Sequence, residues 1–65
     1  MLSFDNLQKG HTYRLVNYGD KVVFQVMEKL NENDWVIKQR DTLEVYHLSD
    51  LTKFGKGVDY ELVEV

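Results

Sequence analysis

The residues able to take part in covalent catalysis are few in this chain. It contains no cysteine, and its serines and histidines are Ser3, Ser49, His11 and His47. Nucleophilic catalysis needs a hydroxyl or thiol beside a base, whereas both serines stand where a residue capping a short helix is expected. The histidines lack the close spacing of a metal site, and so small a domain rarely forms a pocket that excludes water. The sequence therefore predicts a protein that is not an enzyme and holds neither metal nor cofactor.

Phosphate binding is a second chemistry to consider, in the loop Lys53-Phe54-Gly55-Lys56-Gly57. Two glycines and two lysines can bring backbone N–H groups and positive charge towards a phosphate. A Walker loop, however, needs a strand before it and a long helix after it, and this segment does not match that pattern. We interpret it as a connector into the last strand.

The aromatic residues form a third candidate. A core of this size holds about four or five rings that bury about 150 to 250 Å² each, so some of the rings must reach the surface. If Tyr18, Tyr46 and Tyr60 gather at one end of the domain near Asp20 or Asp41, they can enclose a cation such as a modified lysine. The alternative is three half-buried tyrosines with solvated hydroxyls. The aromatic residues are Phe4, Tyr13, Tyr18, Phe24, Trp35, Tyr46, Phe54 and Tyr60.

The elements that must position these residues are short strands separated by turns. Runs of β-branched and aromatic residues are broken at residues 18–21, 31–34, 40–42 and 55–57, with no helix-length amphipathic segment between them. This pattern is typical of a small antiparallel barrel. Ser3 and Gly10 bound a predicted short helix over residues 4–9. Residues 49–55 predict one or two helical turns, of α or 3₁₀ type, before the last strand.

The first two hairpins give a register. Gly19-Asp20 fits a type II′ turn, because glycine accepts the positive φ of its first central position. That turn pairs Tyr18 with Lys21, Val16 with Val23, Leu15 with Phe24 and Tyr13 with Val26. A turn at Glu32-Asn33 pairs Leu30 with Trp35 and Glu28 with Ile37. The two turns predict one core face made of Tyr13, Leu15, Val22, Phe24, Val26, Trp35 and Ile37.

The fourth strand has two possible orientations, because Asp41-Thr42 lacks the glycine that tight turns prefer. Either Tyr46 and Leu48 point inward, or Leu43, Val45 and His47 do. In the last strand, about residues 59–65, Tyr60 and Leu62 are expected inward and Val63 and Val65 outward.

The outward face of the first three strands is unexpectedly apolar for a solvated sheet. Three explanations are open: strong curvature buries both faces, the N-terminal helix packs Leu2, Phe4 and Leu7 across the stripe, or another chain covers it. The outward residues are Val16, Tyr18, Val23, Gln25, Met27, Val36, Lys38 and Arg40.

Length and charge further restrict the classes of function that the chain can have. With 65 residues the chain is expected to form one domain, residues 1–65, and such a domain hides only about 60% of its unfolded surface. The formal charge of −3 repels nucleic-acid phosphates at long range. Met1 to Asp5 do not read as a signal peptide, and no run of about 18 apolar residues predicts a membrane span. We expect a cytoplasmic protein that does not enter membranes.

The predicted order of five strands, with a short capped turn between strands four and five, resembles the SH3-like barrel family in its broad sense, which includes Tudor-type modules. The resemblance covers about residues 11–65 and is one of topology. It implies an all-β, five-stranded antiparallel barrel that serves as a binding module rather than as an enzyme.

The leading hypothesis is an interaction module that presents an apolar and aromatic surface to a protein partner or to its own copy. The predicted binding residues are Tyr18, Met27, Trp35, Tyr46 and Tyr60. The alternative is a barrel associated with nucleic acid, in which exposed rings stack on bases. It would use Lys38, Arg40, Lys53 and Lys56 with Tyr46 and Phe54.

Overall fold

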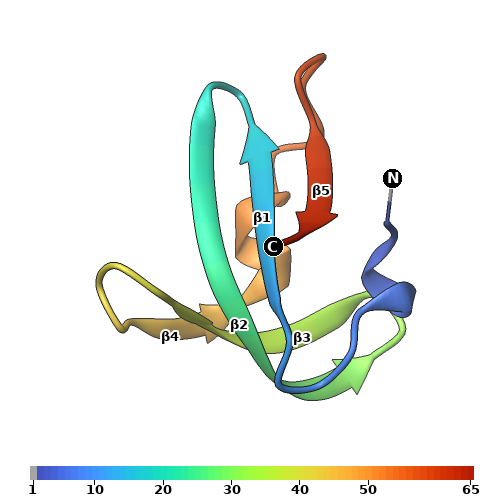
Figure 1. Ribbon diagram of the computed structural model, residues 1–65. Helices are drawn as coiled ribbons and strands as arrows, with labels where there is room; N and C mark the ends of the chain where they lie inside the picture. Colours follow the sequence, from blue (N-terminus) through green and yellow to red (C-terminus); the bar gives the residue numbers. More distant parts are fainter. Residues whose placement is uncertain (1) are drawn as a thin grey trace.

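The computed structural model describes residues 2–65 and confirms an all-β fold. A single antiparallel sheet has the strand order β4-β3-β2-β1-β5 (Figure 1). The strands are β1 (Thr12–Asn17), β2 (Asp20–Asn31), β3 (Asp34–Gln39), β4 (Val45–His47) and β5 (Glu61–Glu64). Two short 3₁₀ helices, η1 (Phe4–Asn6) and η2 (Leu48–Leu51), complete the fold.

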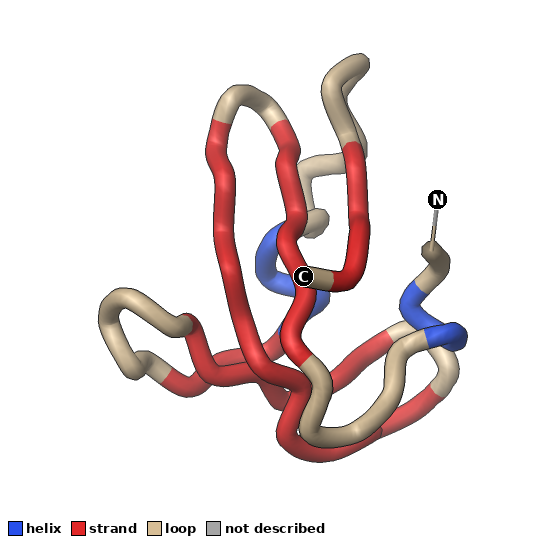
Figure 2. The backbone as a smooth tube through the Cα atoms, in the orientation of Figure 1, coloured by secondary structure: helices blue, strands red, loops and turns tan. Residues whose placement is uncertain are grey.

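The sheet is bent around its longest strand. Figures 1 and 2 show β2 curving from the hairpin with β1 at one end to the hairpin with β3 at the other. Strands β4 and β5 are the two edges of the sheet, so over residues 2–65 the sheet is open and the expected closure into a barrel is not formed. The backbone N–H of Leu2 donates to the carbonyl of Leu62 at 3.3 Å, which partly covers the β5 edge.

The β1–β2 turn differs from the predicted one. Its central residues are Tyr18 and Gly19, with φ of 50° and 81°, and positive φ at both positions is what a type I′ turn requires. Each β1 residue therefore pairs with a residue two positions earlier than predicted. The prediction of which side chains face the core is nevertheless confirmed, because a shift of two residues leaves every side chain on the same face. The observed pairs include Tyr13 with Phe24, Leu15 with Val22 and Asn17 with Asp20.

The β2–β3 hairpin turns at the predicted place, with Asn31 opposite Asp34, but the predicted pairs farther along are wrong. The register shifts once between Val26 and Glu28 and again between Lys29 and Asn31. Bulges of this kind insert unpaired residues into one strand. Trp35 consequently pairs with Lys29, and Ile37 with Val26. Because the two shifts together amount to two residues, Trp35 and Ile37 still face the core, as predicted.

Burial shows which side chains of the fourth and fifth strands point inward. Leu48 is fully buried and Tyr46 packs against the core, whereas Leu43 and Val45 are 65% and 61% exposed. The first of the two orientations considered for strand four is therefore the observed one. In β5, Leu62 is fully buried, so its inward orientation is also confirmed.

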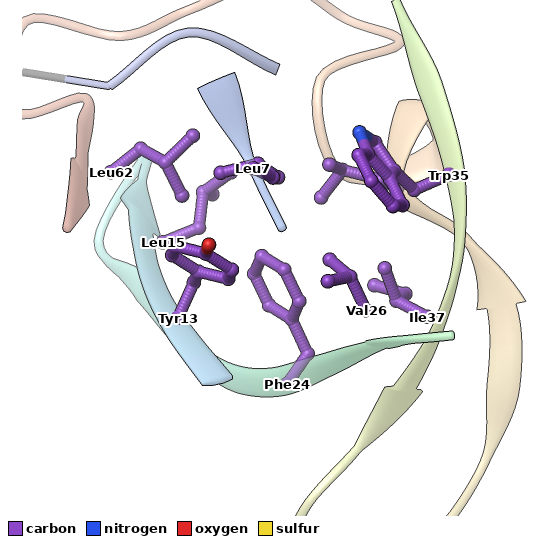
Figure 3. Close-up of a cluster of buried hydrophobic side chains, with 9 residues drawn as sticks. Leu7, Tyr13, Leu15, Phe24, Val26, Trp35, Ile37 and Leu62 are labelled. Atoms are coloured by element: carbon purple, nitrogen blue, oxygen red, sulfur yellow. The ribbon is translucent and has the colours of Figure 1, made fainter. Parts of the chain in front are cut away.

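The core lies on the concave side of the bent sheet, where side chains from both of its halves converge (Figure 3). Around this cluster pack further side chains, including Leu2 and Phe4 from the N-terminal segment. That segment thus covers the inner face, so the second of the three explanations given for the apolar outward stripe does not hold. The buried core residues are Leu7, Tyr13, Leu15, Phe24, Val26, Trp35, Ile37, Leu48 and Leu62.

The N-terminal helix is shorter than predicted. It ends at Asn6, because Leu7 is extended, with ψ of 154°, and turns its side chain into the core. The Asn6 side-chain oxygen accepts hydrogen bonds from the Ser3 backbone N–H at 3.2 Å and the Ser3 hydroxyl at 2.9 Å. Burial of Leu7 thus takes the place of the second helical turn.

The predicted helical turn before the last strand is present as η2, but Ser49 is not its cap. Ser49 lies inside the turn, and Asp34 of β3 holds it from outside. The Asp34 carboxylate accepts the Ser49 backbone N–H at 3.0 Å and the Ser49 hydroxyl at 3.1 Å. A carboxylate on β3 therefore satisfies a backbone N–H at the start of η2. Sequence patterns within residues 48–51 could not indicate this partner.

Replacing Asp34 with alanine should destabilise the domain. Hydrogen bonds to a charged group contribute about 1.5 to 3 kcal/mol, so we expect the free energy of unfolding of Asp34→Ala to fall by about 2 kcal/mol in urea denaturation. Asp50→Ala removes an exposed acid from the same turn and should cost less than about 0.5 kcal/mol. Equal losses in the two variants would contradict the role of Asp34.

Candidate functional site

A groove of about 430 Å³ opens at the end of the sheet where the β1–β2 turn meets the segment that follows η2. Figure 1 shows this turn and the loop before β5 at the same end of the molecule. Three aromatic rings and two carboxylates line the groove, together with one lysine, Lys21. We call it the aromatic groove, and these rings and carboxylates belong to Tyr18, Tyr46, Phe54, Asp20 and Asp50.

Tyr18 is held at the groove by the loop before β5. Its hydroxyl donates to the carbonyl of Phe54 at 3.2 Å. The backbone N–H groups of Tyr18 and Gly19 donate to the two carboxylate oxygens of Asp59, at 2.9 and 2.7 Å. These two bonds satisfy the backbone N–H groups at the tip of the hairpin and hold Tyr18 in its positive-φ conformation.

Asn17 joins the hairpin to the same loop from the inside. Its side chain is buried, and its amide nitrogen donates to the carbonyls of Leu51 at 3.1 Å and Gly55 at 3.0 Å. Its side-chain oxygen accepts the backbone N–H of Gly57 at 2.7 Å. A Cβ atom at Gly57 would lie 2.9 Å from Cδ1 of Tyr18, so glycine is what allows the ring to pack there.

Tyr46 forms the opposite wall. Its hydroxyl donates to Oε1 of Gln39 at 2.6 Å, and the Gln39 amide donates to Asp41 at 2.8 Å. Burial raises the pKa of Tyr46 above 10.0, and the nearby carboxylates of Glu44, Asp41 and Asp50 raise it further. Those carboxylates favour positive charge at this wall.

Two of the rings that line the groove are exposed to solvent. Phe54 is 82% exposed and Tyr18 is 59% exposed. The ammonium group of Lys53 lies 5.3 Å from the centre of the Phe54 ring, within the range of a cation–π contact. Large apolar side chains gathered around a recess are a feature of surfaces that bind other molecules.

The structure brings together some of the predicted site residues and separates others. Tyr18, Tyr46 and Asp20 share the groove, while Tyr60 lies outside it, half-buried beneath the ammonium of Lys56 at 4.8 Å. Met27 is 38% exposed on the outward face. Trp35 is only 3% exposed, so it is a core residue in this structure rather than a surface contact.

The predicted binding residues of the leading hypothesis did not include Asn17, Asp50 or Phe54, which line the groove; Phe54 was expected only as a stacking ring in the nucleic-acid alternative. Asn17 carried a usable signal, since it alternates with Tyr13 and Leu15 on the core face. A polar residue at a core position must find hydrogen-bond partners. Phe54 carried no such signal, because its position depends on how the loop after η2 folds back.

A second groove, of about 390 Å³, lies on the outward face of the sheet and includes Lys38 and Arg40 in its lining. We call it the basic groove. Lys53 and Lys56 are not among its lining residues, and each lies over an aromatic ring of the loop before β5. The cations expected to form one nucleic-acid surface are thus divided between two parts of the molecule.

Within residues 2–65, His47 lies near Ser49 but does not contact its hydroxyl. Ser49 donates its hydroxyl to Asp34, and Nδ1 of His47 lies 3.5 Å from the same carboxylate. A base that activates serine must contact the hydroxyl itself, whereas here the carboxylate stands between the two. His11 instead contacts the exposed Glu64 at 2.9 Å.

No helix within residues 2–65 is both long and apolar enough to cross a membrane. Comparisons of the chain with protein-family models, with curated proteins and with solved structures found no match.

Proposed function

We propose that this domain is a non-enzymatic interaction module whose aromatic groove holds a cationic side chain of a protein partner. The observation that carries the proposal is the convergence of Tyr18, Tyr46 and Phe54 with Asp20 and Asp50 in one groove. Aromatic faces and carboxylates both attract ammonium and guanidinium groups. The arrangement of five strands with a 3₁₀ turn before the last one supports an SH3-like fold, which is part of the same proposal.

A protein partner suits this surface better than a small molecule does. The rings of Tyr18 and Phe54 are exposed as well as lining the groove, and interfaces between proteins combine such aromatic anchors with a polar rim. Lysines already lie over the rings of Phe54 and Tyr60 within this loop. The negative charge of the whole chain also favours a basic partner segment.

Amide chemical-shift titration tests the proposal. The probes are two short peptides that differ only at a central lysine, which is norleucine in the second. The lysine peptide should shift the amides of Tyr18, Phe54 and Gly55, and Phe54→Ala should weaken its binding about two- to fivefold, the effect of one exposed cation–π contact. Met27→Ala, on the outward face, is the matched control and should leave the affinity unchanged.

Equal binding of the norleucine peptide would overturn the role of the cation, and an absence of shifts in the groove would overturn the site. Sedimentation of the protein alone distinguishes a second copy from a different protein as the partner. Weakening of self-association by Phe54→Ala would assign the groove to contacts between copies.

A further inference from the structure

The basic groove has its own chemistry, on the face of the sheet opposite the core. The strand register aligns Thr12 of β1 with Gln25 of β2, and Gln25 with Lys38 of β3. Lys38 and Arg40 are two residues apart, so both are placed on this outward side. The backbone N–H of Arg40 donates to the carbonyl of Val23 at 2.9 Å, which keeps Arg40 beside β2 after β3 has ended.

The two cations of this groove have no acidic partner on the described chain. The ion pairs within residues 2–65 involve His11, Arg14, Lys29 and His47, and none involves Lys38 or Arg40. No carboxylate lines the groove either. A chain of net charge −3 thus places two cations in one recess that no carboxylate lines, an arrangement that an anionic ligand would stabilise.

The β3–β4 turn gives the groove an apolar wall. The backbone N–H of Leu43 donates to the carbonyl of Gln39 at 2.9 Å, and that of Gln39 donates to the carbonyl of Glu44 at 2.8 Å. These bonds hold Leu43 at a positive φ of 62°, and its side chain, 65% exposed, lines the groove beside the two cations.

We propose that the basic groove binds a phosphate monoester, with the phosphoryl group between Lys38 and Arg40 and the organic part against Leu43. Two unpaired cations match a dianion better than a single carboxylate, and the planar guanidinium can form two parallel bonds to phosphate oxygens. Thr12 adds a hydroxyl at the same surface. Gln39 lines both grooves, but this proposal does not rest on the function proposed for the aromatic groove.

A nucleic acid fits this groove less well. No aromatic side chain lines it, so bases would find no ring to stack on. The net negative charge opposes a long polyanion more than it opposes a single phosphate. The volume of about 390 Å³ is in the range of sites for small molecules.

The test is an amide chemical-shift titration at constant ionic strength with glycerol 3-phosphate, with glycerol, with sulfate and with a short phosphoserine peptide. Glycerol 3-phosphate should give saturable shifts at Thr12, Lys38, Arg40 and Leu43, and glycerol should give none. The phosphoserine peptide distinguishes the sources of the monoester: tighter binding than glycerol 3-phosphate would assign the group to a modified protein, and weaker binding to a free small molecule.

Matched double variants separate a site from general charge. Lys38→Gln with Arg40→Gln should weaken binding of glycerol 3-phosphate at least about tenfold, because both charge-assisted contacts are lost. Lys53→Gln with Lys56→Gln changes the net charge equally and should alter the affinity less than about twofold. Equal weakening by the two double variants, equal shifts with sulfate, or no saturable shifts would each overturn the proposal.

Discussion

Replacing Trp35 with alanine is expected to remove most of the stability of the domain. The side chain is 3% exposed, and its indole N–H donates to the carbonyl of Phe4 at 2.8 Å. Truncation of a buried tryptophan costs about 3 to 5 kcal/mol, and native domains have only about 5 to 15 kcal/mol in total. A domain of 65 residues belongs at the low end of that range. Urea denaturation followed by circular dichroism measures the loss.

Trp35→Phe is the control for this variant. It retains one ring in the core but removes the donor to Phe4 and part of the indole volume, so the loss should be smaller, about 1 to 2 kcal/mol. If Trp35→Ala instead kept nearly the full stability of the parent, Trp35 would not be a core residue, and the original interpretation of it as a binding contact would return.

The second large effect is expected at Asn17. Its side chain makes three hydrogen bonds to the backbone of residues 51–57, and each contributes about 0.5 to 1.5 kcal/mol. Asn17→Ala should therefore lower the free energy of unfolding by about 2 to 3 kcal/mol. The same variant should release the loop that holds Tyr18, so exchange of the Gly57 amide hydrogen should accelerate more than exchange in β2.

Asn31→Ala provides the comparison. Asn31 is the exposed last residue of β2, and its side chain accepts one hydrogen bond, from the Asn33 backbone N–H at 2.8 Å. Its loss should cost less than about 1 kcal/mol. Unchanged exchange at Gly57 in Asn17→Ala would contradict the role of Asn17 as the link between hairpin and loop.

The faces of the strands were predictable, but their partners were not. Gly19 can occupy either central position of a primed turn, as the first residue of type II′ or the second of type I′. The choice depends on Tyr18, whose hydroxyl and backbone N–H donate to Phe54 and Asp59 of the loop before β5, 36 and 41 residues later in the sequence. That contact is tertiary, so local turn preferences favour the wrong type. The predicted core face was nevertheless correct, because the pairing shifted by two residues and side chains alternate with a period of two.

The bulges in β2 mark another limit of sequence reasoning. Met27 and Leu30 lie at the two register shifts, but both are apolar residues, as are others in the strand, and no glycine marks either place.

Part of the candidate site could be predicted, since Tyr18, Tyr46 and Asp20 do lie together. Tyr60 was expected with them, but the loop after η2 brings Phe54 to the groove instead. The conformation of that loop depends on Asn17, which lies far from it in sequence.

The length of β2 has a consequence for how the molecule unfolds. This one strand pairs with β1 through its first half and with β3 from Phe24 onward, so both halves of the sheet share it. Separating β2 from either neighbour removes support from the common core, and unfolding is expected to be cooperative. A ligand that binds only the native state then raises the melting temperature of the whole chain, whichever groove it occupies.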